Sequence, residues 1–448
     1  MRIYNSKSLK VEEFKPIKEG EVSMYVCGPT VYSDMHIGNA RPMVVFDTLK
    51  RVFEALGYKV KYVSNYTDVD DKIINEASKK NISELELTNE MIERVKTIRE
   101  LLNASDLYKT PRVTETMEDI EAFIEELVMN GYAYQVCGDV YFRTASIKDY
   151  GLLANQKIED FKVGARIEEN TNKESPLDFT LWKKTETGIR WPFKYSLGRP
   201  GWHTECVVMI KKELGDVIDI HGGGKDLRFP HHENERAQAR ALYGTDLANY
   251  WVHNGMIDIE GVKMSKSLGN FITAQKAIEA YGAMTIRWLL LSNHYRDDIN
   301  ISSATLEAAQ KELDRSLSAI KQASLKLSLN SYEGKEREKK SYDAFINAME
   351  DDLNTPNAFS VVFEVTKRIN TQVRQKEVDL NALSRDLESL KAMLDILGIR
   401  YHEVHLDKED RDLYDAWQKA KEAKDFSKAD EYRQVLKERD LLWWGLKI

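Results

Sequence analysis

Residues 22–64 contain the stretch that decides the fold: VSMYV at 22–26 is a short apolar run, and KVKYVS at 59–64 alternates between apolar and polar residues. An alternation with period two is typical of a β-strand. Between the two runs, apolar residues over 41–56 recur at helical spacing, and Gly57 follows them as a C-terminal cap. A strand, a helix and a strand of this length predict a right-handed crossover in a parallel sheet.

Further along the chain, strand-like runs at 217–221 and 250–253 extend the predicted sheet, and apolar spacing predicts a helix over 80–106. Ligands of parallel sheets bind beyond the carboxyl ends of the strands. The segments CGPT at 27–30 and YTD at 66–68 fall at those ends. We therefore expect the functional site to include them.

The rest of the chain differs from this sheet pattern. Residues 110–215 are irregular, with a hairpin-like run at 139–143, and we interpret them as an insertion in the sheet domain. After about residue 304 the chain is almost purely helical and charged.

Composition excludes several classes of protein. The chain has 448 residues, of which 42% are hydrophobic and 31% charged, which favours two to four folded domains over disorder. A net charge of −8 argues against a general nucleic-acid coat protein but allows a local basic groove. Three cysteines are too few for a disulfide framework, and no run approaches the roughly 18 apolar residues of a membrane span. We expect a cytoplasmic protein with no membrane segment.

Two cysteines, a histidine and a glutamate form a candidate metal site. Cys27 lies at a predicted strand end, Cys206 closes the segment GWHTEC, and His231 and Glu235 share one face of a predicted helix. Two thiolates, an imidazole and a carboxylate suit zinc in geometry and softness. The spacing is wide, so the residues alone leave open two ordinary buried cysteines and a surface His/Glu pair.

Two other segments are candidate phosphate-binding elements. HIGN at 36–39 stands where the first strand's loop turns into its helix, and Gly38 allows a ligand to approach backbone donors at a positive helix end. KMSKS at 263–267 is a small-residue loop with two lysines and two hydroxyls. Taken separately, the first is also compatible with a helix start beside a lone histidine, and the second with a solvated basic turn.

The two elements together resemble the HIGH and KMSKS signatures of class I aminoacyl-tRNA synthetases. Further segments narrow the resemblance to the cysteinyl-tRNA synthetase family, and it runs over essentially the whole chain. These segments are CGPTVY at 27–32, NYTDVDDK at 65–72, GRPGWHTEC at 198–206, FPHHENE at 229–235 and DDLNTP at 351–356.

The resemblance implies an α/β fold in which a Rossmann-like parallel-sheet catalytic domain carries an insertion and is followed by a mostly α-helical C-terminal region. The expected parts are a catalytic domain in two halves (1–113 and 216–255), an insertion or connective domain (114–215), a KMSKS/stem-contact domain (256–310), a helical bundle (311–396) and a small anticodon-binding domain (397–448).

The resemblance also implies the roles of the signature residues. His36, Gly38, Asn39 and Lys266 are expected to bind ATP, and His36, Asn39, Lys263 and Lys266 to be catalytic, with Mg²⁺ accompanying the nucleotide. The family usually has histidine where this chain has Asn39. An amide donates a hydrogen bond but carries no positive charge, so we expect a weaker or altered phosphate contact.

For the amino-acid end of the site, Cys27, Cys206, His231 and Glu235 stand where the family keeps four ligands of one Zn²⁺ ion. Cysteine and serine differ by one atom, which a hydrophobic pocket discriminates by only about 1–3 kcal/mol, whereas a soft metal selects sulfur. Gly28, Thr67, Trp202 and Asp226 are expected to bind the substrate, Asp226 through its ammonium group.

The implied reaction has two steps. The carboxylate of L-cysteine attacks the α-phosphate of ATP and pyrophosphate leaves, and the cysteinyl group then passes to the 3′ end of tRNA(Cys). We expect a monomer whose RNA contacts fall on the C-terminal helical portion, including basic residues between 419 and 439 and the pair Trp443 and Trp444.

Two other functions are compatible with the same motifs. A cysteine ligase of thiol biosynthesis shares the catalytic core but joins cysteine to an amino sugar, and it needs no anticodon domain. A catalytically silent zinc-and-nucleotide-binding paralogue is the other. The roughly 140 residues after the KMSKS domain favour the tRNA enzyme over the first, and the intact KMSKS segment argues against the second.

Overall fold

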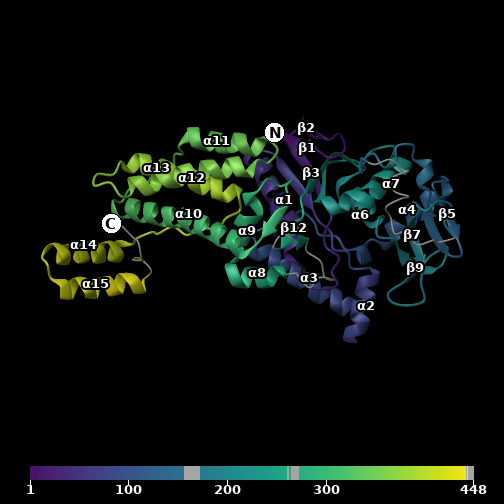
Figure 1. Ribbon diagram of the computed structural model, residues 1–448, viewed down its shortest axis with the longest axis horizontal. Helices are drawn as coiled ribbons and strands as arrows, with labels where there is room; N and C mark the ends of the chain where they lie inside the picture. The colour runs from purple at the N-terminus through teal and green to yellow at the C-terminus, as the bar shows by residue number, and fades with distance from the viewer. Residues whose placement is uncertain (156–171, 260–261, 264–271, 440, 442–448) are drawn as a thin grey trace. The chain divides into compact units, whose positions relative to one another are not determined.

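The computed structural model describes residues 1–155, 172–259, 262–263, 272–439 and 441 (Figure 1). The chain divides into two compact units. Unit 1 comprises Met1–Ser303 with Glu350–Leu353, and unit 2 comprises Ala304–Met349 with Asn354–Ile448.

Unit 1 is built on a four-stranded parallel sheet, as predicted. The strand order is β11-β10-β3-β4, so the strand from the second half of the domain pairs directly with the first strand of the predicted crossover. The strands are β3 (Glu21–Val26), β4 (Lys59–Val63), β10 (Ile218–Gly224) and β11 (Ala248–Asn254).

Helices cover both faces of this sheet. The crossover helix α1 (Ile37–Ala55) packs so closely on one face that a Cβ atom at Gly222 would lie 2.3 Å from the Phe46 ring. The opposite face shares a core with three helices, in which Tyr25 and Trp251 are fully buried. These helices are α4 (Met117–Met129), α6 (Glu205–Leu214) and α7 (Glu233–Tyr243).

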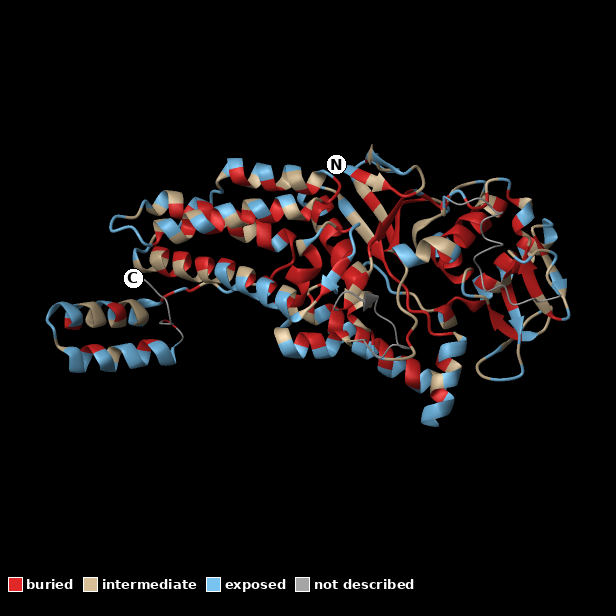
Figure 2. Cartoon of the chain, in the orientation of Figure 1, coloured by how far each residue is buried: buried red, intermediate tan, exposed pale blue. Residues whose placement is uncertain are grey.

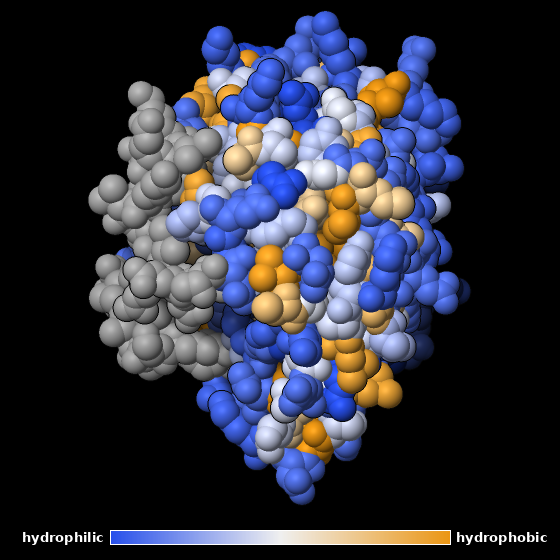
Figure 3. Space-filling model, turned by 90° about the vertical axis from the view of Figure 1, so that its right-hand side faces the viewer, coloured by the Kyte–Doolittle hydropathy of each residue, from blue (hydrophilic) through white to orange (hydrophobic). Residues whose placement is uncertain are grey.

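The insertion is a five-stranded antiparallel sheet of order β5-β6-β7-β9-β8. On this side of unit 1 the visible surface is mostly hydrophilic, with apolar groups scattered over it (Figure 3). The strands are β5 (Ala133–Val136), β6 (Asp139–Phe142), β7 (Phe179–Lys184), β8 (Trp191–Pro192) and β9 (Leu197–Pro200).

The single helix predicted over 80–106 is wrong in its bounds. The structure has α2 (Asp71–Lys80) and α3 (Glu84–Leu101), separated by Asn81 in the left-handed conformation (φ 56°) and by Ser83, whose hydroxyl caps α3. Asparagine tolerates positive φ, and serine is a preferred N-cap, so these residues end one helix and begin the next.

A smaller sheet includes Lys263, the first residue of the second signature. Strand β12 (Ile257–Ile259) pairs with β13 (Val262–Lys263) and β14 (Ile299–Ile301), and helices α8 (Ala274–Tyr281) and α9 (Ala283–Ser292) lie between β13 and β14 in the chain. At the N-terminus, β1 (Arg2–Asn5) and β2 (Lys10–Glu13) form an antiparallel pair that the sequence patterns had not indicated.

Helices are the only regular secondary structure among the described residues of unit 2, and buried residues lie on the faces that these helices turn toward one another (Figure 2). A separate small core, including Tyr414 and Leu436, joins the last two helices to the segment before them. The helices are α10 (Ser303–Leu329), α11 (Lys339–Glu350), α12 (Thr355–Gln372), α13 (Leu380–Ile396), α14 (Lys408–Glu422) and α15 (Phe426–Glu438).

The DDLNTP segment contributes residues to both units. Asp352 is buried in unit 1, where its carboxylate accepts hydrogen bonds from the Tyr4 amide (2.7 Å), the Tyr295 hydroxyl (2.7 Å) and Arg296 Nε (2.9 Å). Its backbone lies in the left-handed region (φ 58°), as does that of Leu353 (φ 51°). Within unit 1, these contacts hold Asp352 against the N-terminal strand and the loop after α9.

Several of the basic residues expected to contact RNA are paired with nearby acids. Arg439 bonds Glu409 and Asp410, and the Lys421 ammonium lies 4.3 Å from the ring centroid of Trp417. Trp443 and Trp444 lie outside the described residues.

The division of the chain into six parts stays a prediction. No described helix is long and apolar enough to span a bilayer.

We predict that Arg287→Met costs about 3–5 kcal/mol of unfolding free energy, because it removes a buried guanidinium that bonds both the Asp47 carboxylate and the Leu102 carbonyl and leaves Arg51 as the remaining charged partner of Asp47. Arg287 on α9 and Asp47 on α1 are 0% and 2% exposed at their side chains, and they join the two helices by a salt bridge. Urea unfolding followed by tryptophan fluorescence measures the change.

Lys96→Ala is the matched control, because the Lys96–Glu93 pair is exposed and should contribute less than about 1 kcal/mol. An equal loss in both variants would contradict the assignment of this stability to the buried pair. Replacing Arg287 and Asp47 together by Met and Leu should recover part of the loss.

Candidate active site and metal centre

The four predicted metal ligands meet at one point, although they come from different elements. Cys27 follows β3, Cys206 lies in the first turn of α6, His231 lies in the short helix Arg228–His232, and Glu235 lies in α7. One donor atom from each lies within 4.8 Å of the donor atoms of the other three.

The donor separations are those of a close cluster. The Cys27 and Cys206 sulfur atoms are 3.8 Å apart, and Cys206 Sγ lies 3.8 Å from His231 Nε2. Glu235 Oε1 lies 3.7 Å from Cys27 Sγ and 3.1 Å from His231 Nε2.

Sheet pairing explains why residues so far apart in sequence converge. Strands β3 and β10 are parallel, with Val26 opposite Gly222, and the Cys27 amide donates to the Gly222 carbonyl (3.2 Å). The carboxyl ends of both strands therefore lie at the same edge of the sheet.

Three further histidines, which the sequence analysis did not single out, surround the cluster. His221 Nε2 lies 2.7 Å from Glu235 Oε2, and His232 Nε2 lies 3.4 Å from Cys27 Sγ. His232 Nδ1 in turn lies 2.8 Å from His253 Nε2. Cys27, His221, His232 and Glu235 thus form a second group with metal-ligand geometry.

The sequence did contain a signal for two of these histidines. The predicted strands at 217–221 and 250–253 both end at a histidine, and parallel strands bring their carboxyl ends to one edge. For His232 the sequence gave no such signal, because the adjacent His231 was an equally good candidate for a metal ligand. Only the folded backbone shows which part of the cluster each imidazole faces.

The ionisable groups of the cluster shift one another's pKa values. A hydrogen bond from Cys27 lowers the pKa of Cys206 to about 7 against the opposing effect of burial, whereas burial and the Cys206 thiolate raise the pKa of Cys27. Burial lowers the pKa of His231, but attraction to Glu235 and Cys206 outweighs it and raises that pKa to about 10. Thiolate and carboxylate charge is thus gathered around one cationic imidazole.

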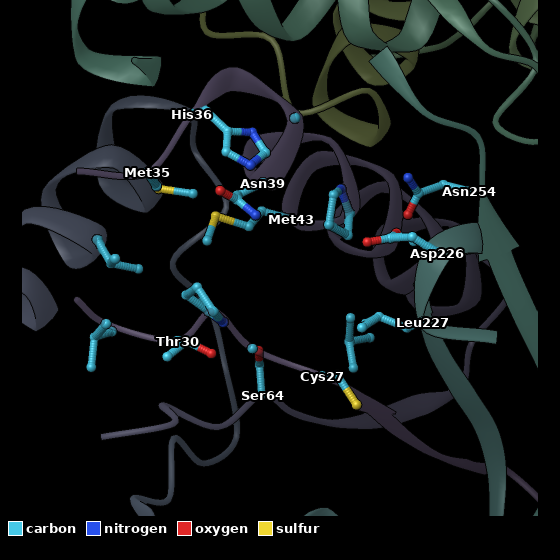
Figure 4. A pocket seen from close by; sticks show the side chains of 18 of the residues that line it. Cys27, Thr30, Met35, His36, Asn39, Met43, Ser64, Asp226, Leu227 and Asn254 are labelled. Carbon is cyan, nitrogen blue, oxygen red and sulfur yellow. The ribbon is translucent and has the colours of Figure 1, made fainter. Parts of the chain in front are cut away.

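Of the four clustered donors, Cys27 lines a cavity of about 340 Å³ that extends to the first signature, whereas Cys206, His231 and Glu235 are buried and do not line it. Figure 4 shows His36 and Asn39 toward one end, Cys27 toward the other, and Asp226 at the side between them. Of the predicted ligand-contacting residues, those that line the cavity are Cys27, Gly28, His36, Gly38, Asn39, Trp202 and Asp226.

Thr67 is the exception among the predicted substrate residues. It is 2% exposed and absent from the cavity wall, and its hydroxyl lies 3.4 Å from the Glu205 carboxylate. The Thr67 backbone instead supports the wall, because its carbonyl accepts from the Val31 amide (3.1 Å). Gly28 is needed on that wall, since a Cβ there would lie 1.6 Å from the Asn65 carbonyl oxygen.

The first signature is bonded to the segment that follows the second. The Ile37 amide donates to the Ile272 carbonyl (3.0 Å), and the Ala274 amide donates to the Met35 carbonyl (2.9 Å). Lys263 lies in β13 opposite Asp258, whereas Lys266 lies outside the described residues.

Arg41 of α1 also holds the first signature in place relative to the small sheet. It is 0% exposed, and its guanidinium donates to the carbonyls of Met256 (2.9 Å) and Asp297 (2.5 Å). Met256 immediately precedes β12, and Asp297 lies two residues before β14. A residue two positions after Asn39 thus holds both connections to the small sheet that carries Lys263.

Comparisons with known proteins agree with this architecture. Residues 13–311 match the family described as the class I tRNA synthetase (C) catalytic domain, and residues 344–401 match the DALR domain. Among solved structures, methionyl-tRNA synthetase of Mycobacterium tuberculosis with methionyl-adenylate aligns with a TM-score of 0.63 and 16% identity, covering 84% of this chain and 89% of that one. The fold is that of a class I aminoacyl-tRNA synthetase, and the matched catalytic domain spans the residues that line the cavity.

Curated relatives narrow the class. A cysteine–tRNA ligase of Exiguobacterium sibiricum is 45% identical over 99% of this chain and 97% of its own length, and one of Oceanobacillus iheyensis is 43% identical with the same coverage. The chain belongs to the cysteine–tRNA ligase family.

We predict that His221→Leu weakens metal binding about 10- to 100-fold, because Glu235 loses the hydrogen-bond partner that orients its carboxylate. Titration with cobalt(II), followed by the absorption of the thiolate-bound ion, measures the affinity. His221→Gln is the control, since an amide keeps a donor at this position. Unchanged affinity in the Leu variant would contradict the orienting role.

Proposed function

We propose that the protein activates L-cysteine with ATP to cysteinyl-adenylate and transfers the cysteinyl group to the 3′ end of tRNA(Cys). One observation supports the proposal: a single cavity is lined at one end by Cys27, one of the four clustered metal-ligand residues, and at the other by His36, Gly38 and Asn39 of the HIGN signature. The amino acid's side chain and the nucleotide's phosphates have matching partners at opposite ends, so the reacting carboxylate and α-phosphate meet between them.

At the nucleotide end, the protein accelerates adenylate formation by positioning the phosphates and by supplying positive charge. A carboxylate oxygen of cysteine attacks the α-phosphorus, the bond to the β-phosphate oxygen breaks, and pyrophosphate leaves with the electron pair. The amides at the start of α1 and the side chains of His36 and Asn39 supply hydrogen-bond donors for the phosphates. Lys266, with Lys263 in support, follows the leaving pyrophosphate, and Mg²⁺ accompanies ATP.

At the amino-acid end, the donor set fits zinc. Zn–S bonds of about 2.3 Å and Zn–N/O bonds of about 2.0 Å in a tetrahedron imply ligand separations of about 3.3–3.8 Å. The observed Cys27–Cys206, Cys206–His231 and Cys27–Glu235 separations of 3.8, 3.8 and 3.7 Å fall at the upper end of that range, and the His231–Glu235 separation of 3.1 Å falls slightly below it. When bound, zinc supplies a soft acceptor that prefers a thiolate to an alcohol.

The remaining polar groups suit the backbone atoms of an amino acid. The Asp226 carboxylate is exposed on the cavity wall and makes no hydrogen bond or ion pair to any other described residue, which fits it for the substrate ammonium. Trp202 covers the metal-ligand side, where its ring stacks on His231 with a centroid separation of 4.4 Å. We propose that the enzyme acts in the cytoplasm as a monomer, with residues 397–448 binding the anticodon.

The direct test is cysteine-dependent ATP–pyrophosphate exchange together with charging of total tRNA. We expect both activities, and we expect cysteine to exceed serine by at least about 10⁴-fold in kcat/KM. Removing zinc with a chelator should reduce that ratio to about 10–200, the range that a pocket reaches by shape alone. Activity with an amino sugar in place of tRNA would support the thiol-biosynthesis ligase, and full discrimination without zinc would contradict the recognition role of the metal.

We predict that Asn39→His raises the rate of exchange about three- to tenfold at pH 6 and by less at pH 8. An imidazole with a pKa near 6.5 is cationic only below that pH, where its hydrogen bond to phosphate gains charge assistance. The ratio of variant to wild-type kcat across this range is the measurement. A ratio that stays constant with pH would show that charge at this position has no influence.

A further inference from the structure

A second cavity, of about 760 Å³, opens on the other side of Trp202. Its wall comes from the start of α2, from strands of the insertion and from the segment around Phe229. Trp202 lines both cavities and is 40% exposed, although its ring stacks on His231. The volume lies within the roughly 300–1,000 Å³ of ligand pockets.

The acidic groups of this second cavity are already engaged. Asp71 accepts from both Lys183 (2.9 Å) and Arg199, and the Asp70 carboxylate caps α2 by accepting from the Lys72 amide (2.7 Å). Asp139 accepts from the Tyr141 hydroxyl (2.8 Å). Cationic partners therefore balance the charge of Asp71, whereas Asp70 and Asp139 keep their negative charge although neutral donors bond their oxygen atoms.

Two positively charged side chains of this cavity, in contrast, have donors that no described residue uses. Arg199 is only 5% exposed, yet its Nη1 atom has no hydrogen-bond partner among the described residues. A buried donor without a partner costs about 1–3 kcal/mol, so a ligand that accepts from it gains that energy. Lys173 makes no ion pair within the described chain, and its ammonium lies 5.9 Å from the ring centroid of Tyr141.

The geometry points to this second cavity as the binding site for the penultimate nucleotide of the tRNA acceptor end, with its phosphate at Arg199 and its base against Trp202. The inference rests on the proposed function. The terminal ribose must reach the adenylate in the first cavity, and the RNA chain must leave that cavity past a shared wall. A guanidinium and an exposed indole at that wall match a phosphate and a base.

The test compares two RNAs: a full-length tRNA(Cys) transcript and a transcript that lacks its last two nucleotides. Arg199→Gln should weaken binding of the full-length RNA about 5- to 20-fold and of the shortened RNA less than twofold. Lys173→Ala, on a partly exposed side chain, should show the same selectivity at about two- to fivefold. Arg190→Gln, an exposed arginine of the insertion that lies outside this cavity, is the matched control.

Equal losses with both RNAs, or no loss with either, would overturn the inference. If Arg199→Gln fails to fold, Lys173→Ala decides by the same criterion. Exchange and charging by the wild-type protein are measured in parallel. Wild-type activity combined with unselective variants refutes the cavity assignment alone, whereas a wild-type protein without cysteine-dependent exchange refutes the proposed function and the inference with it.

Discussion

The parallel pairing of β3 with β10 is the constraint on which the candidate site depends. It places Cys27 beside Gly222, across an interval of 195 positions in the chain, and it directs α6 and α7 onto one face of the sheet and α1 onto the other. The thiol cluster therefore forms on the α6/α7 side of the strand ends. The start of α1 lies beyond the same ends, so one edge of the sheet supplies both halves of the cavity.

A second set of contacts fixes the small sheet relative to this edge. Arg41 donates to the carbonyls of Met256 and Asp297, and Asp352 accepts from Tyr295 and Arg296 one or two positions before Asp297. Within unit 1, the loop after α9 is thus held by Arg41 of α1 and by Asp352. These are buried charged groups with several partners each, and such groups favour one geometry over alternatives because any other leaves a charge unpaired.

Local patterns sufficed for the parallel sheet, the crossover helix and the position of the site. Alternation and helical spacing predict only whether a residue faces a hydrophobic core. The end of a predicted strand indicates only that a residue lies at the carboxyl edge of the sheet. They missed the break between α2 and α3, which depends on the φ of Asn81, and the N-terminal strand β1, which is held by Asp352 nearly 350 positions away. The sequence places both His221 and Thr67 near the carboxyl edge of the sheet, but it does not predict their contacts. Packing in the folded protein brings His221 against Glu235, whereas Thr67 is buried and supports the cavity wall through its backbone.

The electrostatics of the cluster explain why a divalent cation suits it. Two sulfur atoms and a carboxylate oxygen lie within 4.8 Å of one another and are largely withheld from water, so the anionic forms repel unless positive charge lies among them. Among the described residues that charge is placed on His231, whose pKa rises to about 10, while His203 and His253 have pKa values lowered to about 3 by burial. One imidazolium balances only one of these negative charges. A dication at the same point would balance two and would free the imidazole nitrogen as a ligand, so the charges of this donor set fit a metal ion better than a proton.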